Sequence, residues 1–326
     1  MQIRDLGEFP FIRRLRGRVA ADPRVTLGMG DDCAALSLSG TTLLTTDALV
    51  ENVHFRREWT PFVSLGAKAF AVNASDIIAM GGEPTFALLS VCTPQDDRVE
   101  DLDAFFDGFL AAAGERQVAL IGGNMSAGPC LTVSVTLLGR APHGIVTRSG
   151  ARVGDDVYVT GSLGDAALGL RLFQDGRDDA VAQGPKDRFV CPQLRFELAR
   201  AITAQSLVSA MLDVSDGLLQ DLGHLCEESR VGARIEASRL PVSDAYRSLL
   251  GPQAWDLALT GGEDYELLFC APPAQRDALR AVAETCGCAL TRIGTIVPER
   301  DGSRVLDAAG EPYLPTQVGH DHFRRA

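Results

Sequence analysis

The sequence predicts a two-domain protein of the α/β class (α+β), and three observations lead to this prediction. The chain has 326 residues, which is about twice the roughly 150 residues of a typical domain. Short runs rich in Thr, Val and Leu, typical of strands, alternate with longer stretches in which apolar residues recur at helical spacing. The order of strands and helices is mixed in both halves. Residues 140–155 are dense in Gly, Pro and charge, so we expect domains 1–150 and 151–326.

In the first half, strand-like runs end beside acidic residues or glycines. The helix expected over 62–80 has Phe62, Leu65, Ala69 and Val72 at helical spacing and ends before the glycine pair at 81–82. A second helix is expected over 102–114. The expected strands are 42–46, 85–92, 118–121 and 131–138.

The second half has the same mixture of elements. The expected strands are 157–160, 207–212, 261–270 and 290–296. The expected helices are 165–173, 192–204, 217–228 and 274–286. Residues 175–188 are mostly polar, and this composition predicts an exposed loop.

Composition excludes several classes of function. With 43 acidic and 31 basic residues, the formal net charge is −12, which argues against nucleic acid or an anionic membrane surface as the main partner. No run approaches 18 apolar residues, so no membrane span is expected. The N-terminal residues carry charges throughout and do not resemble a signal peptide. The eight cysteines lack the C-x-x-C spacing of zinc sites, so we expect small buried thiols in the reducing cytoplasm.

Aspartates recur at the ends of apolar runs, beside Gly, Ser and Thr. The segments are Gly30-Asp31-Asp32, Thr45-Thr46-Asp47, Asn73-Ala74-Ser75-Asp76 and Asp213-Val214-Ser215-Asp216-Gly217. Each segment alone also fits a solvated turn or a helix cap. Together they predict a Mg²⁺ site, because Mg²⁺ prefers such hard oxygen ligands and keeps room for substrate phosphates. Bound divalent ions would let an acidic protein attract phosphates.

Glycine pairs form a second set of candidate sites. Gly122-Gly123-Asn124 follows an expected buried strand, where backbone amides without neighbouring side chains can approach phosphate oxygens. A glycine pair alone equally fits a tight turn. Neither the G-x-x-x-x-G-K-[ST] loop nor the G-x-G-x-x-G fingerprint occurs, so the sequence indicates neither common nucleotide-binding motif.

Several longer motifs, in order from residue 28 to residue 323, together resemble those of the thiamine-monophosphate kinase family. They are Gly28-Met29-Gly30-Asp31-Asp32-Cys33-Ala34, Thr45-Thr46-Asp47 with His54-Phe55, Ala71-Val72-Asn73-Ala74-Ser75-Asp76 with Ala79-Met80-Gly81-Gly82, Thr147-Arg148-Ser149-Gly150-Ala151, Asp213-Val214-Ser215-Asp216-Gly217-Leu218, Gly261-Gly262-Glu263-Asp264-Tyr265-Glu266-Leu267 and Gly319-His320-Asp321-His322-Phe323. The resemblance implies an aminoimidazole ribonucleotide synthetase-like fold. In that fold the N-terminal domain binds ATP and Mg²⁺. Its mixed sheet pairs with the same sheet of a second copy to form a dimer barrel, and a C-terminal α/β domain follows.

The resemblance also implies roles for particular residues. The implied Mg²⁺ ligands, for several ions, are Asp32, Thr45, Thr46, Asp47, Asp76, Asn124, Asp213 and Asp216. The implied ATP contacts are Gly123, Asn124, Arg148 and Ser215. The implied thiamine monophosphate contacts are His54, Glu263 and His320. Among these, Asp47, Asp76 and Arg148 would be catalytic. Asn124 stands where the family usually has Asp, and His320 where it usually has an aromatic ring.

The implied activity is ATP-dependent, in-line phosphorylation of thiamine monophosphate to thiamine diphosphate, by a cytoplasmic homodimer that binds neither nucleic acid nor a membrane. Two alternatives stay open. One is a related ATP-dependent enzyme of the same superfamily that acts on another phosphorylated small molecule. The other is a non-catalytic regulator that binds ATP or thiamine phosphates, an alternative that Asn124 suggests.

Overall fold

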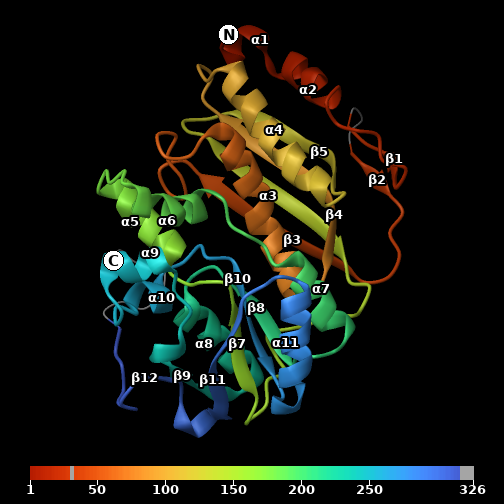
Figure 1. The fold of residues 1–326 in the computed structure, drawn as a ribbon. Coiled ribbons are helices and arrows are strands. Elements are labelled where there is room, and N and C mark those ends of the chain that lie inside the picture. The colour runs from red at the N-terminus through yellow and green to blue at the C-terminus, as the bar shows by residue number, and fades with distance from the viewer. Residues whose placement is uncertain (30–32, 316–326) are drawn as a thin grey trace. The chain divides into compact units, whose positions relative to one another are not determined.

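The computed structural model describes residues 1–29 and 33–315. The chain divides into two compact units, Met1–Ile77 with Gly82–Pro142, and Ile78–Gly81 with His143–Ala326. Both units combine helices with a mixed β-sheet (Figure 1). The expected α/β class with two domains is therefore confirmed.

The first unit contains a four-stranded sheet with the order β3-β6-β4-β5. Strands β3 and β4 are antiparallel to β6, and β5 is parallel to β4. The elements of this unit are α1 (Ile3–Leu6), α2 (Glu8–Arg16), β1 (Val25–Leu27), β2 (Ala35–Leu36), β3 (Thr42–Val50), α3 (Phe62–Ala79, whose last two residues belong to the second unit), β4 (Glu83–Thr93), α4 (Val99–Glu115), β5 (Ala119–Ala127) and β6 (Thr132–Arg140). The helices expected over 62–80 and 102–114 are thus confirmed.

Helices α3 and α4 lie side by side over one face of this sheet (Figure 1). Glycine permits their close approach, because a Cβ at Gly108 would lie 1.8 Å from the carbonyl oxygen of Val63. Helix α3 is apolar and long enough to span a membrane, but 72% of that stretch is buried inside the protein, as in a core helix. On the opposite face of the sheet, Leu44 of β3 is 67% exposed.

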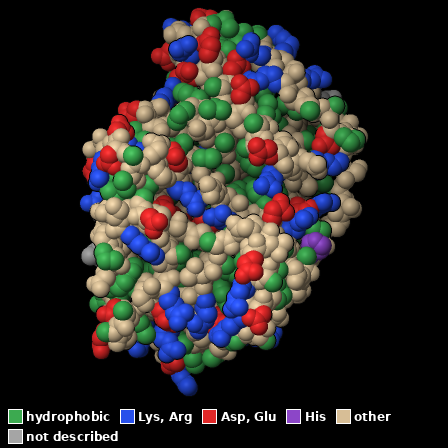
Figure 2. Space-filling model, viewed as in Figure 1, with side chains coloured by type: hydrophobic (Ala, Val, Ile, Leu, Met, Phe, Trp, Pro, Cys, Tyr) green, Lys and Arg blue, Asp and Glu red, His purple; other side chains and the backbone are tan. Residues whose placement is uncertain are grey.

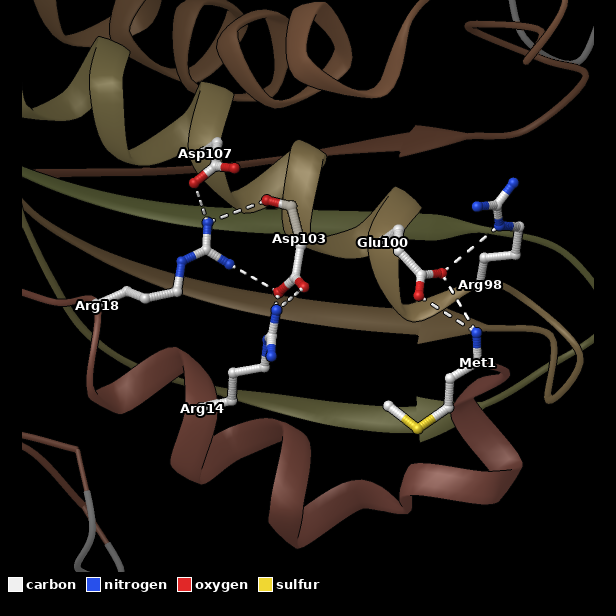
Figure 3. A network of polar contacts seen from close by, with 7 residues as sticks. All are labelled: Met1, Arg14, Arg18, Arg98, Glu100, Asp103 and Asp107. Atoms are coloured by element: carbon white, nitrogen blue, oxygen red, sulfur yellow. Dashed lines mark hydrogen bonds and ion pairs between the residues drawn. The ribbon is translucent and has the colours of Figure 1, made fainter.

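The N-terminal helices are fastened to α4 by packing and by ion pairs. Phe11 is buried, with its ring centroid 5.8 Å from that of Phe106. Figure 3 shows Arg14 and Arg18 converging on Asp103, at 2.5 and 2.9 Å. Exposed ion pairs contribute little stability, so the aromatic contact carries most of this attachment.

The second unit contains a six-stranded sheet with the order β12-β9-β11-β7-β10-β8. Its strands are antiparallel except for the parallel pair β12 and β9. The elements are β7 (Asp156–Thr160), α5 (Asp165–Gln174), α6 (Ala180–Val190), α7 (Phe196–Ala204), β8 (Ala210–Val214), α8 (Leu218–Ser229), β9 (Val231–Glu236), α9 (Asp244–Leu250), α10 (Asp256–Thr260), β10 (Glu266–Ala271), α11 (Arg276–Thr285), β11 (Leu290–Pro298) and β12 (Arg304–Leu306), with short 3-10 turns at 237–239, 273–275 and 299–301.

Three expectations about local structure are wrong. Residues 175–188 are not a loop, because α6 begins after Asp179, whose carboxylate accepts from the backbone N–H groups of residues 181 and 182. Strand β3 continues past Asp47, which therefore lies inside the strand. Of the eight cysteines, all without disulfides, only Cys226 and Cys270 are buried. Burial raises the pKa of both thiols.

Candidate active site

Strand β3 and helix α3 bring three of the expected metal-binding residues together. Oγ1 of Thr45 donates a 2.5 Å hydrogen bond to Oδ2 of Asp76. Two residues along the strand, the backbone N–H of Asp47 donates a 2.9 Å hydrogen bond to Oδ1 of Asn73. The buried Asn73 amide also donates to the carbonyl oxygen of Ala69, so it fixes the strand against the helix. Because side chains two residues apart leave the same face of a strand, Thr45 and Asp47 both leave the face that bonds to α3.

Thr46 has a different environment. Its Oγ1 donates a 3.0 Å hydrogen bond to the carbonyl oxygen of Val135 and accepts a 3.2 Å hydrogen bond from Thr136. Both partners belong to the neighbouring strand β6. Thr46 alternates with Thr45 along β3, so the two hydroxyl groups leave opposite faces of the sheet. A metal-binding role for Thr46 stays a prediction.

Gly123 and Asn124 lie on the opposite edge of the sheet from Asp47. In the register of the strands, Asp47 stands opposite Val135, Val135 opposite Leu89, and Leu89 opposite Gly123. Three strand spacings separate the two edges, about 14 Å. A Cβ at Gly123 would lie 1.9 Å from the carbonyl oxygen of Leu89, so only glycine fits there. Within one chain, the structure therefore does not bring Asn124 to Asp47.

The expected substrate-binding residue His54 lies on the turn that follows β3. Its Nδ1 accepts a 3.0 Å hydrogen bond from the backbone N–H of Val50, which places the proton of the neutral imidazole on Nε2. Arg57 holds the same turn through Glu51, at 2.7 Å, and Asp97, at 2.6 Å. Hydrogen bonds to the two carboxylates raise the pKa of Arg57 further above its ordinary value.

In the second unit, the end of β8 and the start of α8 form an acidic loop. Asp213 is buried in the strand, and Asp216 follows it three residues later. Oδ2 of Asp221 accepts hydrogen bonds from three consecutive backbone N–H groups, those of Ser215, Asp216 and Gly217, each at 3.1 Å. The sequence analysis did not select Asp221. The sequence feature that could have identified Asp221 is an acidic residue in the first turn of a helix, directly after an Asp-x-x-Asp-Gly run.

The electrostatics of this loop favour a bound cation. Asp221 is 4% exposed, and its burial, together with repulsion by Asp213 and Asp216, raises the pKa of Asp221 to about 7. Nε2 of Gln220 donates to Oδ2 of Asp216 at 3.1 Å. The carboxylates of Asp213 and Asp216 are hard oxygen donors of the kind that Mg²⁺ prefers, so this loop can supply part of a magnesium site.

The segment before β10 packs directly on this loop. The backbone N–H of Glu263 donates to the carbonyl oxygen of Ser215 at 2.7 Å, and that of Tyr265 donates to Val214 at 2.8 Å. Glu263 and Tyr265 have φ angles of +69° and +50°, a left-handed conformation that is costly for residues other than glycine. Two such residues within one short segment are typical of functional sites.

Between these two residues, Asp264 fastens the turn that follows β7. Its carboxylate accepts from the backbone N–H groups of Gly164, at 2.6 Å, and Ala166, at 3.3 Å. Burial raises the pKa of Asp264 well above its ordinary value. The turn at 161–165, the acidic loop and the segment at 261–266 therefore meet at one end of the sheet, which brings together two of the sequence motifs, those at 213–218 and 261–267.

Glu266, the first residue of β10, is a buried anchor for this end of the sheet. It is fully buried, and Arg195 binds it through two nitrogen atoms at 2.6 and 2.5 Å. Arg188 adds a contact at 3.3 Å and Thr160 donates its hydroxyl at 2.6 Å. Buried ion pairs of this kind are costly to break, so Glu266 stabilises the strand that carries the motif.

Arg148, the expected catalytic and nucleotide-binding arginine, is exposed on a segment whose backbone is fixed. Oγ of Ser229 donates to the carbonyl oxygen of Arg148 at 2.9 Å. Oγ of Ser229 also accepts hydrogen bonds from the backbone N–H groups of Gly150 and Ala151, each at 3.1 Å. The arginine side chain therefore extends from a rigid base.

The expected site residues thus form two groups, one in each unit. Thr45, Asp47 and Asp76 form the first, and Asp213, Asp216 and Glu263 belong to the second. Within residues 1–29 and 33–315, no three His, Cys, Asp or Glu side chains are arranged to hold one metal ion by themselves. Asp32 and His320 lie outside the described residues.

Comparison with known proteins identifies the family. Two family models match the chain, the AIR synthase related protein N-terminal domain over residues 30–141 and the C-terminal domain over residues 152–307. The thiamine-monophosphate kinase of Escherichia coli K12 is 38% identical over 325 residues, covering 97% of this chain and 98% of that protein. The chain belongs to the thiamine-monophosphate kinase family.

Solved structures of this family agree with the fold. The crystal structure of thiamine-monophosphate kinase from Stenotrophomonas maltophilia K279a is 40% identical, with a TM-score of 0.84, and covers 94% of this chain and 98% of that chain. The structure of AaThiL complexed with AMPPCP and TMP is 31% identical, with a TM-score of 0.75, and covers 99% of both chains. The match to kinases of this family extends over both units.

Proposed function

We propose that this protein transfers the γ-phosphoryl group of ATP to thiamine monophosphate and releases thiamine diphosphate and ADP. Its membership of the thiamine-monophosphate kinase family, over nearly the full length, carries the proposal. A phosphate oxygen of thiamine monophosphate attacks the γ-phosphorus of ATP, and the bond from that phosphorus to the β,γ-bridging oxygen breaks in line. The attacking oxygen is already anionic, so the reaction requires positioning and charge neutralisation more than a strong base.

We further propose that acidic residues of both groups bind Mg²⁺. Asp47 and Asp76, with the hydroxyl of Thr45, supply oxygen donors in the first unit, and Asp213 and Asp216 in the second. Asp32, Thr46 and Asn124 are further proposed ligands. Bound Mg²⁺ would neutralise charge on the transferring phosphoryl group. The raised pKa of Asp221 agrees with this proposal, since burial and, to a smaller extent, the carboxylates of Asp213 and Asp216 disfavour a further negative charge at this place.

The remaining roles concern the two substrates. The backbone at Gly123 would approach the nucleotide phosphates, because no side chain crowds it, while Asn124, Arg148 and Ser215 complete the proposed ATP contacts. Thiamine monophosphate would contact His54, whose imidazole is oriented by the hydrogen bond from Val50, together with Glu263 and His320. We propose that residues 1–150 form the ATP-, Mg²⁺- and dimer-binding domain and residues 151–326 the second domain, in a cytoplasmic enzyme.

The sheet of the first unit supports a homodimer. β3 and β5 are its two edge strands, and an unpaired edge readily pairs with another chain. The face opposite α3 and α4 also exposes Leu44, and a second copy would cover it. We expect Leu44→Lys to convert a dimer to a monomer in light scattering after size-exclusion chromatography, whereas Val153→Lys, at another exposed apolar residue, should not. A wild-type monomer would contradict the proposed dimer.

Product analysis tests the proposed reaction. The purified protein is incubated with ATP, Mg²⁺ and thiamine monophosphate, and the thiamine phosphates are separated by chromatography. We expect thiamine diphosphate with Mg²⁺, none with EDTA, and a loss of at least about a hundredfold in Asp47→Asn and Asp76→Asn. A protein that binds both substrates but forms no product would be a regulator. Turnover with another phosphorylated acceptor only would indicate a different enzyme of the superfamily.

A further inference from the structure

A separate cavity of about 580 Å³ lies in the second unit, between helix α11 and strands β7 and β11. Its polar lining includes Tyr158, Arg276, Arg280 and Arg292, and apolar side chains of α11 and β11 form much of the remainder. Lys and Arg side chains gather on the lower part of the face seen in Figure 2, the part in which Figure 1 draws α11 and β11. None of the lining residues belongs to the motifs assigned above to ATP, Mg²⁺ or thiamine monophosphate. The volume falls within the range of small-molecule sites.

One buried carboxylate holds two of these arginines in place. Asp156 is 1% exposed, and Arg276 binds it through Nε at 2.6 Å and Nη2 at 2.9 Å. Arg292 binds it through Nε at 2.5 Å and donates from Nη2 to Oγ1 of Thr295 at 3.0 Å. These bonds fix both guanidinium planes, and Arg276 also interacts with the phenol of Tyr158. A guanidinium group carries five N–H donors, so both arginines keep donors for a ligand. The hydrogen bonds that would hold a ligand are thereby pre-organised.

The remaining polar groups add positive charge to the cavity lining. Arg280 follows Arg276 by one helical turn and is 70% exposed, with only a 3.5 Å contact to the highly exposed Asp277. Burial and the charge of Asp156 raise the pKa of Tyr158, so its phenol stays protonated. With three arginines against the carboxylates of Asp156 and the lining residue Glu284, the net charge of these side chains is one positive charge. This charge matches a ligand with a single anionic group.

We propose that this cavity binds an oxyanion, the phosphoryl or carboxylate group of a small molecule, through Arg276, Arg280 and Arg292. Planar guanidinium groups bind such anions through paired hydrogen bonds. The adjoining apolar surface of α11 and β11 would take the uncharged part of the ligand. This site is independent of the proposed kinase reaction.

Calorimetric titration of the full chain with pyrophosphate, in EDTA and at constant ionic strength set with chloride, tests the site. The decisive variant is Arg280→Glu, since this exposed arginine is not needed for folding. Its matched control is Arg247→Glu, the same change at an exposed arginine of α9 outside the cavity. Arg276→Lys is the second variant, because it keeps the charge beside Asp156 and removes the planar fork. Asp47→Asn is included to detect any pyrophosphate that binds at the proposed catalytic site instead of the cavity.

We expect Arg280→Glu and Arg276→Lys each to weaken pyrophosphate binding by about tenfold or more, and Arg247→Glu and Asp47→Asn to change it less than about twofold. Thermal unfolding of each variant confirms that it is folded. The proposal is overturned if the wild type does not bind pyrophosphate. It is also overturned if both arginine variants bind pyrophosphate as tightly as the wild type does, because the anion then occupies another site. This holds whatever the effect of Asp47→Asn.

Discussion

Asp221 offers a quantitative test of the acidic loop between β8 and α8. Its carboxylate does two opposing things. It accepts three backbone hydrogen bonds, which favour the ionised form, whereas its burial and the charges of Asp213 and Asp216 oppose ionisation. Asp221→Asn removes the charge and keeps an acceptor oxygen, whereas Asp221→Ala removes both. The two variants therefore separate the hydrogen bonds from the charge.

The magnitude follows from the pKa. A rise from 3.8 to about 7, at about 1.4 kcal/mol per pKa unit, disfavours the ionised carboxylate in the folded state by up to about 4 kcal/mol. Because the folded-state pKa is raised, the stability that Asp221 contributes is fully present below about pH 4 and is lost as the pH rises to about 7. The stability of the wild type relative to Asp221→Asn should therefore fall by up to about 4 kcal/mol between pH 4 and pH 8.

Urea unfolding in EDTA measures this difference. Trp255 is in the core of the second unit, so a Trp59→Phe background leaves one fluorescent reporter there. At pH 5 we expect Asp221→Ala to be about 3 kcal/mol less stable than Asp221→Asn, because three amides lose their acceptor. The reasoning is refuted if the wild type and Asp221→Asn keep a constant difference from pH 4 to pH 8. It is equally refuted if the alanine variant is as stable as the asparagine variant at pH 5.

Three further predictions concern other contacts. Thr45→Val should lower kcat about tenfold or more by releasing the carboxylate of Asp76, while Thr42→Val, at the start of the same strand, should change it little; equal effects in steady-state assays would contradict the assignment. Glu266→Gln should lower the free energy of unfolding by about 3 kcal/mol, because it leaves two partly buried arginines without a counter-charge, and a change below about 1 kcal/mol in urea unfolding would contradict this. Burial raises the pKa of Asp156, but hydrogen bonds from two arginines outweigh burial and lower that pKa. The stability that the Asp156 carboxylate contributes to the fold is therefore present above about pH 4 and is lost as the pH falls. The stability difference between wild type and Asp156→Asn should shrink in acid, and a difference that does not shrink would contradict the assignment.

Local sequence patterns predicted most of the helices and strands. They failed where tertiary packing determines whether a segment is a helix or where a strand ends. Helix α6 is polar in composition, yet Ala182 and Phe189 are buried on it, and so narrow an apolar stripe is hard to distinguish from a loop. Strand β5 continues through its glycines because a bulge at Ile121 shifts its alternation. A glycine pair was expected to end that strand, so the predicted boundary at residue 121 is wrong.

The candidate site was predictable only in part. Asp47 and Asp76 stand out because small polar residues surround them, but their proximity depends on the contact between Asn73 and the strand. Asp221 was missed because an acidic residue in a first helical turn is common. The anion cavity could not be predicted, since Asp156 is 120 residues from Arg276 and no motif spacing connects them.

The binding of divalent cations by the acidic residues of β3 and α3 is the central claim of this account. Mn²⁺, titrated in the presence of AMPPCP and followed by water proton relaxation, tests that claim most directly in wild type, Asp76→Asn and the control Asp277→Asn. We expect Asp76→Asn to weaken Mn²⁺ binding by about tenfold or more and Asp277→Asn to leave it unchanged. Identical Mn²⁺ titrations for all three proteins would contradict the account.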